Sequence, residues 1–186
     1  MNIYDHIYRL ALPYLLTRSN EIHIPISKGF AKTILLTEQG DPEVVIPAII
    51  LHDVGWSALT DEMQLQAFGA GVVDKDLNRM HEVEGVKIAE RLLEEVNYNS
   101  QKALEIINII DKHDSRLSAI SDNDRIVKDA DKLYRFTSEG LIFYLDWFED
   151  VSFEERMAWL TSKVDSWFFT ETAKTLALKE LEERQA

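Results

Sequence analysis

The chain has 186 residues, an apolar fraction of 46% and a formal net charge of −13, so it can bury one sizeable core. Its acidity argues against binding to duplex nucleic acid, because neutralising phosphates requires a basic face. The absence of cysteine excludes disulfides and thiolate metal sites, so any transition metal must be held by histidines and carboxylates.

The amino terminus and the hydropathy pattern predict a cytoplasmic protein without membrane contact. The opening residues, MNIYDHIYRL, carry Asp5, His6 and Arg9 and do not resemble a secretory signal. No window approaches the roughly 18 consecutive apolar residues of a membrane span.

Helical periodicity dominates the chain and strand patterns are scarce, so we predict an all-helical fold. The first two helices are expected over about residues 4–16 and 24–36. Asp41 as N-cap and Pro42 as first helical residue predict a third over about 42–54, with a kink or a later start because of Pro47. Residues 57–76 have weak periodicity and are expected to form a long loop with a helical turn or two, suited to a variable lid.

The second half of the chain predicts further amphipathic helices. They are expected in MHEVEGVKIAERLLEEV, after a cap at Ser100, and after Asp122 or Asn123. The last third predicts three more helices, two of them starting in SFEE and TETA, the first of which has the form of a capping box. The Trp and Phe residues of this last third are expected in the core.

Four of the five histidines are predicted to face inward from helix ends. His81 and His113 share helical faces with apolar residues, and His23 lies on the apolar side of its segment. His52 and Asp53 end the apolar run AIILHD, where Gly55 would let the chain turn away so that both side chains converge beyond the helix end.

A single inward histidine usually has a structural role, and Asp53 alone is most often a hydrogen-bond partner at a helix end. Asp131 also faces inward, however, and burying its charge without a partner would cost several kcal/mol. The histidines and aspartates together, arriving from different helices, favour one shared metal site.

The order of His23, then His52-Asp53 after an apolar lead-in, then Asp131 in VKDADKL resembles the HD domain, a superfamily of metal-dependent phosphohydrolases named for that dipeptide. The resemblance covers about residues 20–137 and extends more faintly to WFFTETAKTLA. It implies an all-α helical bundle with the ligands in a central cleft. We interpret residues 1–186 as one such domain, with a C-terminal helical extension over about 138–186.

The resemblance also implies roles for the ligands. HD proteins with histidines at places like those of His81 and His113 often hold two ions, bridged by the aspartate of the HD pair. On this basis Asp53 would bridge the ions and act in catalysis. One ion would be completed by His23, His52 and Asp131, and the other by His81 and His113. Asp129 is the rival of Asp131 for the terminal position, although ADKL matches the family motif at Asp131.

Such a set suits one or two divalent ions of Fe, Mn, Zn, Ni, Co or Mg. Two close ions activate water and bind phosphoryl oxygens, so we expect a metal-dependent phosphohydrolase. Its substrate would be a small phosphorylated molecule, a nucleotide or another phosphomonoester or phosphodiester. Candidate contacts to the substrate phosphate are Lys112, Arg116, Lys128 and Lys132.

Two other functions remain open at this point. The same ligands would serve a di-iron oxygenase of the HD type. A non-catalytic nucleotide-binding regulatory module is the third interpretation, disfavoured because the ligand set is complete. Trp56 stands where many cyclic-dinucleotide phosphodiesterases of this superfamily carry Lys, and their GYP signature is absent, which argues against that activity.

Overall fold

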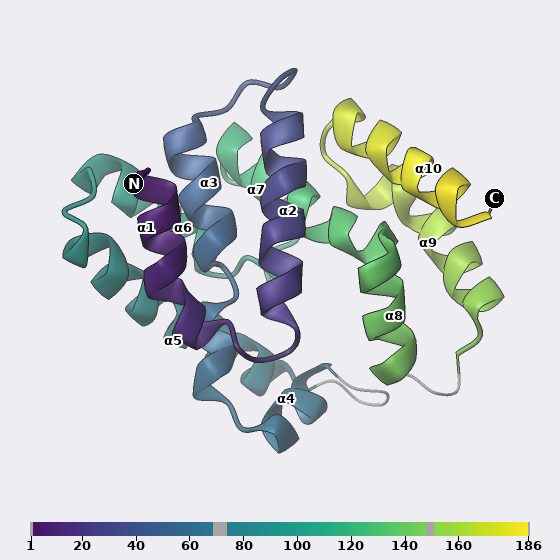
Figure 1. Cartoon of the computed structure of the whole chain (residues 1–186), viewed down its shortest axis with the longest axis horizontal. Helices are drawn as coiled ribbons and strands as arrows, with labels where there is room; N and C mark the ends of the chain where they lie inside the picture. The colour runs from purple at the N-terminus through teal and green to yellow at the C-terminus, as the bar shows by residue number, and fades with distance from the viewer. Residues whose placement is uncertain (1, 69–73, 148–150, 186) are drawn as a thin grey trace.

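The computed structural model describes residues 2–68, 74–147 and 151–185, and every regular element within them is helical (Figure 1). The predicted all-α fold is therefore confirmed. The α-helices are α1 (Ile3–Ala11), α2 (Asn20–Ile34), α3 (Pro42–Leu51), α4 (Asp61–Phe68), α5 (Lys75–Glu95), α6 (Ser100–Ile110), α7 (Asp122–Leu133), α8 (Ser138–Trp147), α9 (Phe153–Trp167) and α10 (Glu171–Gln185). Short 3-10 helices follow three of them: η1 (Leu12–Tyr14), η2 (Val54–Ala58) and η3 (Tyr134–Phe136).

Helix α3 forms the centre of the core. As predicted, Pro42 is its first residue and Asp41 caps it, accepting a hydrogen bond from the amide of Glu43 at 2.8 Å. All its residues from Val44 to Leu51 are buried, and it packs against α2, α6 and α7. This burial brings the carboxyl end of the helix, where His52 is the C-cap, into the interior of the protein.

Pro47 does not delay the start of α3. A proline cannot donate to the carbonyl four residues earlier, which here belongs to Glu43. The hydroxyl of Tyr98 donates to that carbonyl at 2.6 Å instead. A side chain from the turn before α6 thus replaces the missing helical hydrogen bond, and α3 continues through the proline.

Helix α2 begins at Asn20, earlier than predicted, and Pro25 lies inside it. Arg18 and Ser19 both adopt left-handed backbone conformations, with φ of 55° and 56°, and turn the chain immediately before the helix. Such conformations are unfavourable for residues other than glycine and cluster at functional sites. The turn and the first residue of α2 border the site described below.

The predicted loop at 57–76 is largely helical where it is described. Helix η2 and helix α4 occupy its first part, and α5 begins at Lys75 after the N-cap Asp74. Residues 69–73, the remaining part of the expected lid, lie outside the described residues. The sequence pattern missed α4 because a polar residue fills a core position. The amide of the buried Gln64 donates to the carbonyls of Trp56 and Leu59 at 3.1 and 3.0 Å.

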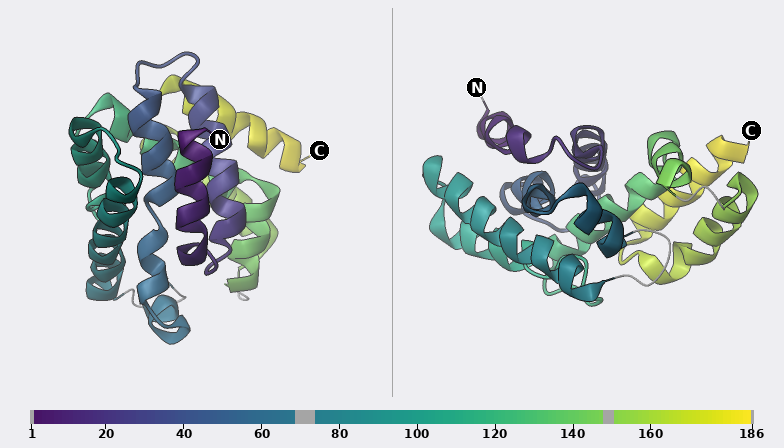
Figure 2. Two further views of the ribbon diagram at one scale, coloured as in Figure 1. Left: turned by 60° about the vertical axis from the view of Figure 1, so that its left-hand side comes forward. Right: turned by 90° about the horizontal axis from the view of Figure 1, so that it is seen from below.

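The three predicted C-terminal helices are α8, α9 and α10, and they lie on the opposite side of the molecule from α1 (Figures 1 and 2). The predicted capping box at the start of α9 is present, with reciprocal hydrogen bonds between Ser152 and Glu155. Helix α10 packs against α9 and α7, and α8 packs against η3 and α2. The C-terminal helices therefore contact the elements that carry the site.

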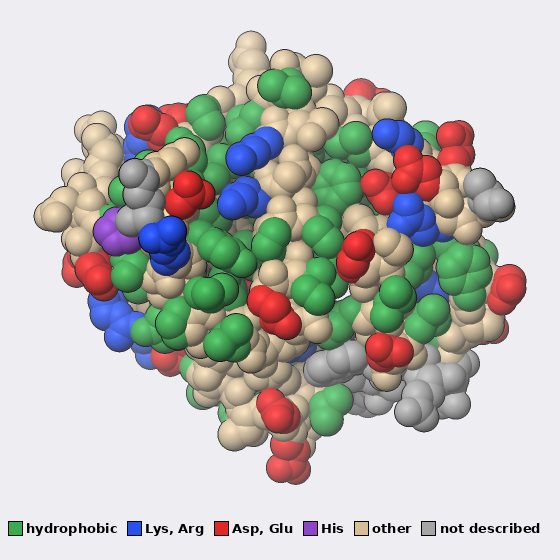
Figure 3. All heavy atoms as spheres, in the orientation of Figure 1, with side chains coloured by type: hydrophobic (Ala, Val, Ile, Leu, Met, Phe, Trp, Pro, Cys, Tyr) green, Lys and Arg blue, Asp and Glu red, His purple; other side chains and the backbone are tan. Residues whose placement is uncertain are grey.

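On the face shown in Figure 3, Lys and Arg side chains are interspersed with Asp and Glu and form no continuous basic surface. Among the described residues, no single helix is long and apolar enough to cross a membrane. Within the described residues, the segments Pro42–Ala58 and Asp61–Ala67 are together long and apolar enough for a membrane span, but the chain bends by 116° between them.

Candidate metal centre

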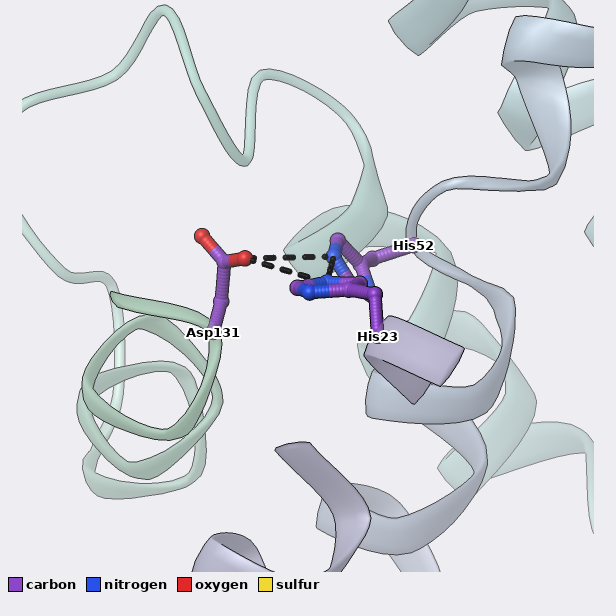
Figure 4. Close-up of side chains that lie close together, drawn as sticks. All are labelled: His23, His52 and Asp131. Atoms are coloured by element: carbon purple, nitrogen blue, oxygen red, sulfur yellow. Dashed lines mark hydrogen bonds and ion pairs between the residues drawn. The ribbon is translucent and has the colours of Figure 1, made fainter. Parts of the chain in front are cut away.

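The structure brings together all six ligand candidates named from the sequence. One group consists of His23 from α2, His52 from the end of α3, and Asp131 from α7 (Figure 4). The Nε2 atoms of His23 and His52 are 3.3 Å apart, and they lie 3.3 and 3.5 Å from Oδ1 of Asp131. In Figure 4 the carboxylate projects from α7 toward the two imidazoles, and these three side chains can share one ion.

A second group lies beside the first and contains His81, His113 and Asp114. The Nε2 atoms of His81 and His113 are 3.4 Å apart, and Oδ2 of Asp114 is 3.7 Å from Nε2 of His81. Asp53 lies between the groups, with Oδ1 at 3.6 Å from Nε2 of His52 and 3.4 Å from Nε2 of His113. This is the position that a carboxylate bridging two ions requires.

The hydrogen bonds of two histidines show that the site fits a metal. Nδ1 of His52 lies 3.0 Å from the carbonyl oxygen of Ile49, and Nδ1 of His113 lies 3.0 Å from that of Ile110. A carbonyl oxygen only accepts, so each Nδ1 carries the proton and donates. When neutral, each imidazole therefore directs the lone pair of Nε2 into the cluster, as metal-binding histidines do.

The electrostatics of the cluster favour bound cations. Burial alone would raise the pKa of Asp53, but the nearby His52, His113 and His23 lower it far below its usual range. Burial would lower the pKa of His52, but Asp53 and Asp131 raise it to about 9, so that the imidazole carries a compensating proton when no metal is bound. Burial and the charge of His113 lower the pKa of His81 to about 4, which keeps it neutral. The site thus combines ionised carboxylates with imidazoles in a buried space.

Asp114 was missed in the sequence analysis, although its signal was present. The chain contains a second His-Asp dipeptide, in KHDS, directly after a helix. Lys112 takes a left-handed conformation with φ of 64°, which turns the chain at this point. Glu82 of α5, fully buried, accepts hydrogen bonds from the amides of Asp114 and Ser115 at 3.0 and 2.7 Å. Glu82 therefore positions the turn that carries His113 and Asp114.

We expect Glu82→Ala to weaken metal binding at the second group and to spare the first. The substitution leaves two amides of the 113–115 turn without their acceptor, and loss of such an orienting partner costs about 10–100-fold in metal affinity. Titration of the metal-free protein with Zn²⁺ would show a weakened second step. The control is Glu84→Ala, which removes a carboxylate that pairs with Lys87 on the same helix. Two unchanged binding steps in Glu82→Ala would contradict this role.

Trp56 is a second residue whose role became visible only in the structure. Its ring stacks on the imidazole of His81, with centroids 3.9 Å apart and planes at 8°. Its indole Nε1 donates to Oδ1 of Asp53 at 3.2 Å. Trp56 therefore orients two of the ligand candidates.

Asp129 and Asp131 have different surroundings on α7. Asp129 accepts hydrogen bonds from the amides of Phe169 and Thr170, both at 2.9 Å, and from the Thr170 hydroxyl at 2.7 Å. It ties α7 to the start of α10, whereas Asp131 faces the histidines. The structure thus favours Asp131 as the terminal ligand.

The basic residues named as phosphate contacts do not line the cavity at this site. Lys112 is exposed, and Arg116 donates to the carbonyl of Asp111 and pairs with Asp124 at 3.3 Å. Lys132 donates to the carbonyl of Trp167 at 3.0 Å, and Lys128 donates to that of His113 at 2.5 Å. Although these residues are close to the ligands in sequence, their side chains donate hydrogen bonds to backbone carbonyls. This holds for Arg116, Lys128 and Lys132.

Different cations line a cavity of about 320 Å³ at the ligands. The ligand candidates His23, Asp53, Asp114 and Asp131 line it together with Arg18, Asn20, Arg135 and Arg156. The remaining lining residues are Trp56, Tyr134, Gly140, Phe143, Tyr144 and Trp159. Trp159 is 40% exposed, so the C-terminal aromatics are not all core residues as the sequence suggested. Of the three arginines, Arg156 lies in a distant segment, whereas Arg18 is five residues before His23 and Arg135 is four residues after Asp131.

The fold and the site agree with the comparison to known families. The family model for the HD domain matches residues 23–135, more than half of the chain, and the chain therefore belongs to the HD-domain family. This confirms the resemblance seen in the sequence. No curated protein and no solved structure matches the chain. The matched region contains both ligand groups, while five residues of the cavity wall lie after it: Gly140, Phe143, Tyr144, Arg156 and Trp159.

Proposed function

We propose that this protein is a metal-dependent phosphohydrolase that acts on a small phosphorylated substrate. The observation that carries the proposal is the pairing of two ligand groups, joined by Asp53, with an arginine-lined cavity. Carboxylates and imidazoles of this kind hold divalent ions, and arginines bind phosphate oxygens.

One divalent ion would be held by His23, His52 and Asp131, and a second by His81, His113 and Asp114, with Asp53 between them. When bound, such ions lower the pKa of a coordinated water to near neutrality and polarise a phosphoryl oxygen. The residues of the chain orient the reactants. Trp56 and the backbone carbonyls keep the ligand side chains in place.

Arg18 is placed to bind the reacting phosphoryl group. Its guanidinium lies over the ring of Trp56, 4.0 Å from the centroid, and the charges of Asp53 and Asp114 act on it. A guanidinium beside the ligands can neutralise oxygens as negative charge moves during attack on phosphorus. The left-handed turn at Arg18 and Ser19 directs the chain at this point.

The di-iron oxygenase remains the second candidate because it would use the same ligands. The arginine-lined cavity favours hydrolysis, since it fits an anionic ester. A purely regulatory module that binds nucleotide would need the cavity but not two complete ligand groups.

The test is a metal add-back screen. The protein is stripped with a chelator, resupplied under anaerobic conditions with Fe²⁺, Mn²⁺, Zn²⁺, Ni²⁺, Co²⁺ or Mg²⁺, and assayed on phosphomonoesters and phosphodiesters. We expect hydrolysis that requires metal and continues without O₂, detected as inorganic phosphate from a monoester or as the monoester and alcohol from a diester. Substrate turnover that consumes O₂ would favour the oxygenase, and no turnover with any metal would contradict the proposal.

A further inference from the structure

Arg156 of α9 is a buried cation that the proposed chemistry at the metal centre does not use. Its residue exposure is 3%, and it lines the cavity. Its guanidinium carbon lies 3.5 Å from the ring centroid of Tyr144 and 4.4 Å from that of Trp159. Contacts with two aromatic rings hold the guanidinium in place and lower the entropy lost when it binds a ligand.

The charge of Arg156 is not neutralised by a carboxylate within the described part of the chain. Neither Arg156 nor Arg135 has an ion pair there, and Nε of Arg156 has no hydrogen-bond partner among these residues. Burial, aided by repulsion from Arg135, lowers the pKa of Arg156 to about 10, although the hydrogen-bonded Tyr144 acts in the opposite direction, so the group is charged at neutral pH. The carboxylates that line the same cavity are the ligand candidates Asp53, Asp114 and Asp131, whose charge bound metal ions would offset. Two buried cations beside them then favour a ligand that supplies negative charge.

The cations extend from the ligands into the cavity. Asp53 and Asp114 attract the charge of Arg18. The charge of Arg135 lowers the pKa of Asp131, and it repels both Arg18 and Arg156. Arg135 and Arg156 line the same cavity and repel each other. Asn20, 2% exposed, also lines this cavity, and its Nδ2 has no hydrogen-bond partner among the described residues. A single phosphoryl group at the ligands would leave the cations at the other end without a counter-charge.

Building on the proposed function, we propose that Arg135 and Arg156 form a second anion subsite, which binds a phosphate of the substrate other than the one that reacts. The substrate class is then a phosphate ester that carries a di- or triphosphate chain. Arginine suits this role, because its planar fork binds phosphate through two parallel hydrogen bonds. Helix α9, in the C-terminal extension, would then select the length of the substrate's phosphate chain, whereas the HD core would supply the metal ligands.

The first test uses inorganic triphosphate as the probe and the full-length protein without metal, so that it does not depend on hydrolysis. Isothermal titration is compared for the wild type, Arg156→Gln, Arg156→Lys and Arg135→Gln. Loss of a charged hydrogen-bond partner corresponds to roughly 10–100-fold in affinity. We expect a loss of that size in both Gln variants and partial retention in Arg156→Lys. The control is Arg125→Gln, which removes an exposed arginine paired with Asp122 on α7.

The second test compares kcat/KM of the metal-loaded enzyme for matched nucleoside mono-, di- and triphosphates. In Arg156→Gln we expect kcat/KM for the di- and triphosphate to fall, mainly because KM rises. The value of kcat/KM for the monophosphate should change little. Thermal unfolding identifies variants that fail to fold, and Arg156→Lys then serves as the informative variant. Equal triphosphate binding by the wild type and Arg156→Gln, or no binding by either, would overturn the subsite. Arginine-dependent binding without hydrolysis would keep the subsite and reject the phosphohydrolase.

Discussion

Asp53→Ala is expected to remove both metal ions and to lower kcat/KM by on the order of 10³-fold or more. Asp53 lies within 3.6 Å of His52 Nε2 and 3.4 Å of His113 Nε2, so its loss affects both ligand groups. His52→Ala should release the first ion, and His81→Ala should release only the second. The two groups can thus be distinguished by the number of ions retained.

Metal content per chain, measured by elemental analysis of anaerobically purified protein, checks this prediction. His6→Ala is the matched control, because His6 belongs to α1 and to neither ligand group. It should retain the metal content and activity of the wild type. If Asp53→Ala kept both ions, the whole metal-centre assignment would fail.

Gly55→Ala is expected to lower the free energy of unfolding by roughly 3 kcal/mol and to weaken metal binding. A Cβ at this position would lie 1.9 Å from the carbonyl oxygen of His81 and 2.4 Å from the amide nitrogen of Gly85. Both atoms are backbone, so they cannot move aside as a flexible side chain would. The substitution would push η2 away from α5 and separate His52 and Asp53 from His81.

Gly29→Ala in α2 makes the same chemical change but is expected to raise the free energy of unfolding. A Cβ there would meet nothing within 4 Å, and alanine in a helix is favoured over glycine by about 1 kcal/mol. Chemical denaturation of both variants measures the two effects. Equal stability of Gly55→Ala and the wild type would show that the close approach of η2 to α5 is not required.

The same contact corrects the sequence-based explanation of Gly55. We expected the glycine to let the chain turn away after the His-Asp pair. In the structure its importance comes from close packing against the backbone of α5, between His81 and Gly85. The expected convergence of His52 and Asp53 remains, but the neighbouring helix explains the glycine.

Most of the ligand set could be predicted because helical periodicity indicates which residues face inward. His23, His81, His113 and Asp131 each share a face with apolar residues, and that relation depends only on local spacing. Asp114 could have been added from the second His-Asp dipeptide. Helix α4 could not be recognised, because Gln64 occupies a core position that a hydrophobic pattern would reject.

The cations of the cavity depended on long-range packing. Arg116 and Lys132 are near the ligands along the chain, yet both bind backbone carbonyls. Arg18 and Arg156 reach the cavity from segments on either side of the matched region, through a strained turn and through α9. Closeness in sequence therefore does not separate Arg135, which lies four residues after Asp131 and lines the cavity, from the cations that bind backbone carbonyls.

The sequence by itself determined the helical class, the HD family and the residues able to hold metal, because these follow from local periodicity and from the kinds of side chain present. Only the tertiary structure decided which of them lie within reach of one another, that Asp53 lies between two groups, and that Arg18, Arg135 and Arg156 line the same cavity. The physical reason is that coordination and charge compensation act over a few ångströms in space, and the packing of α2, α3, α5, α7 and α9 sets those distances.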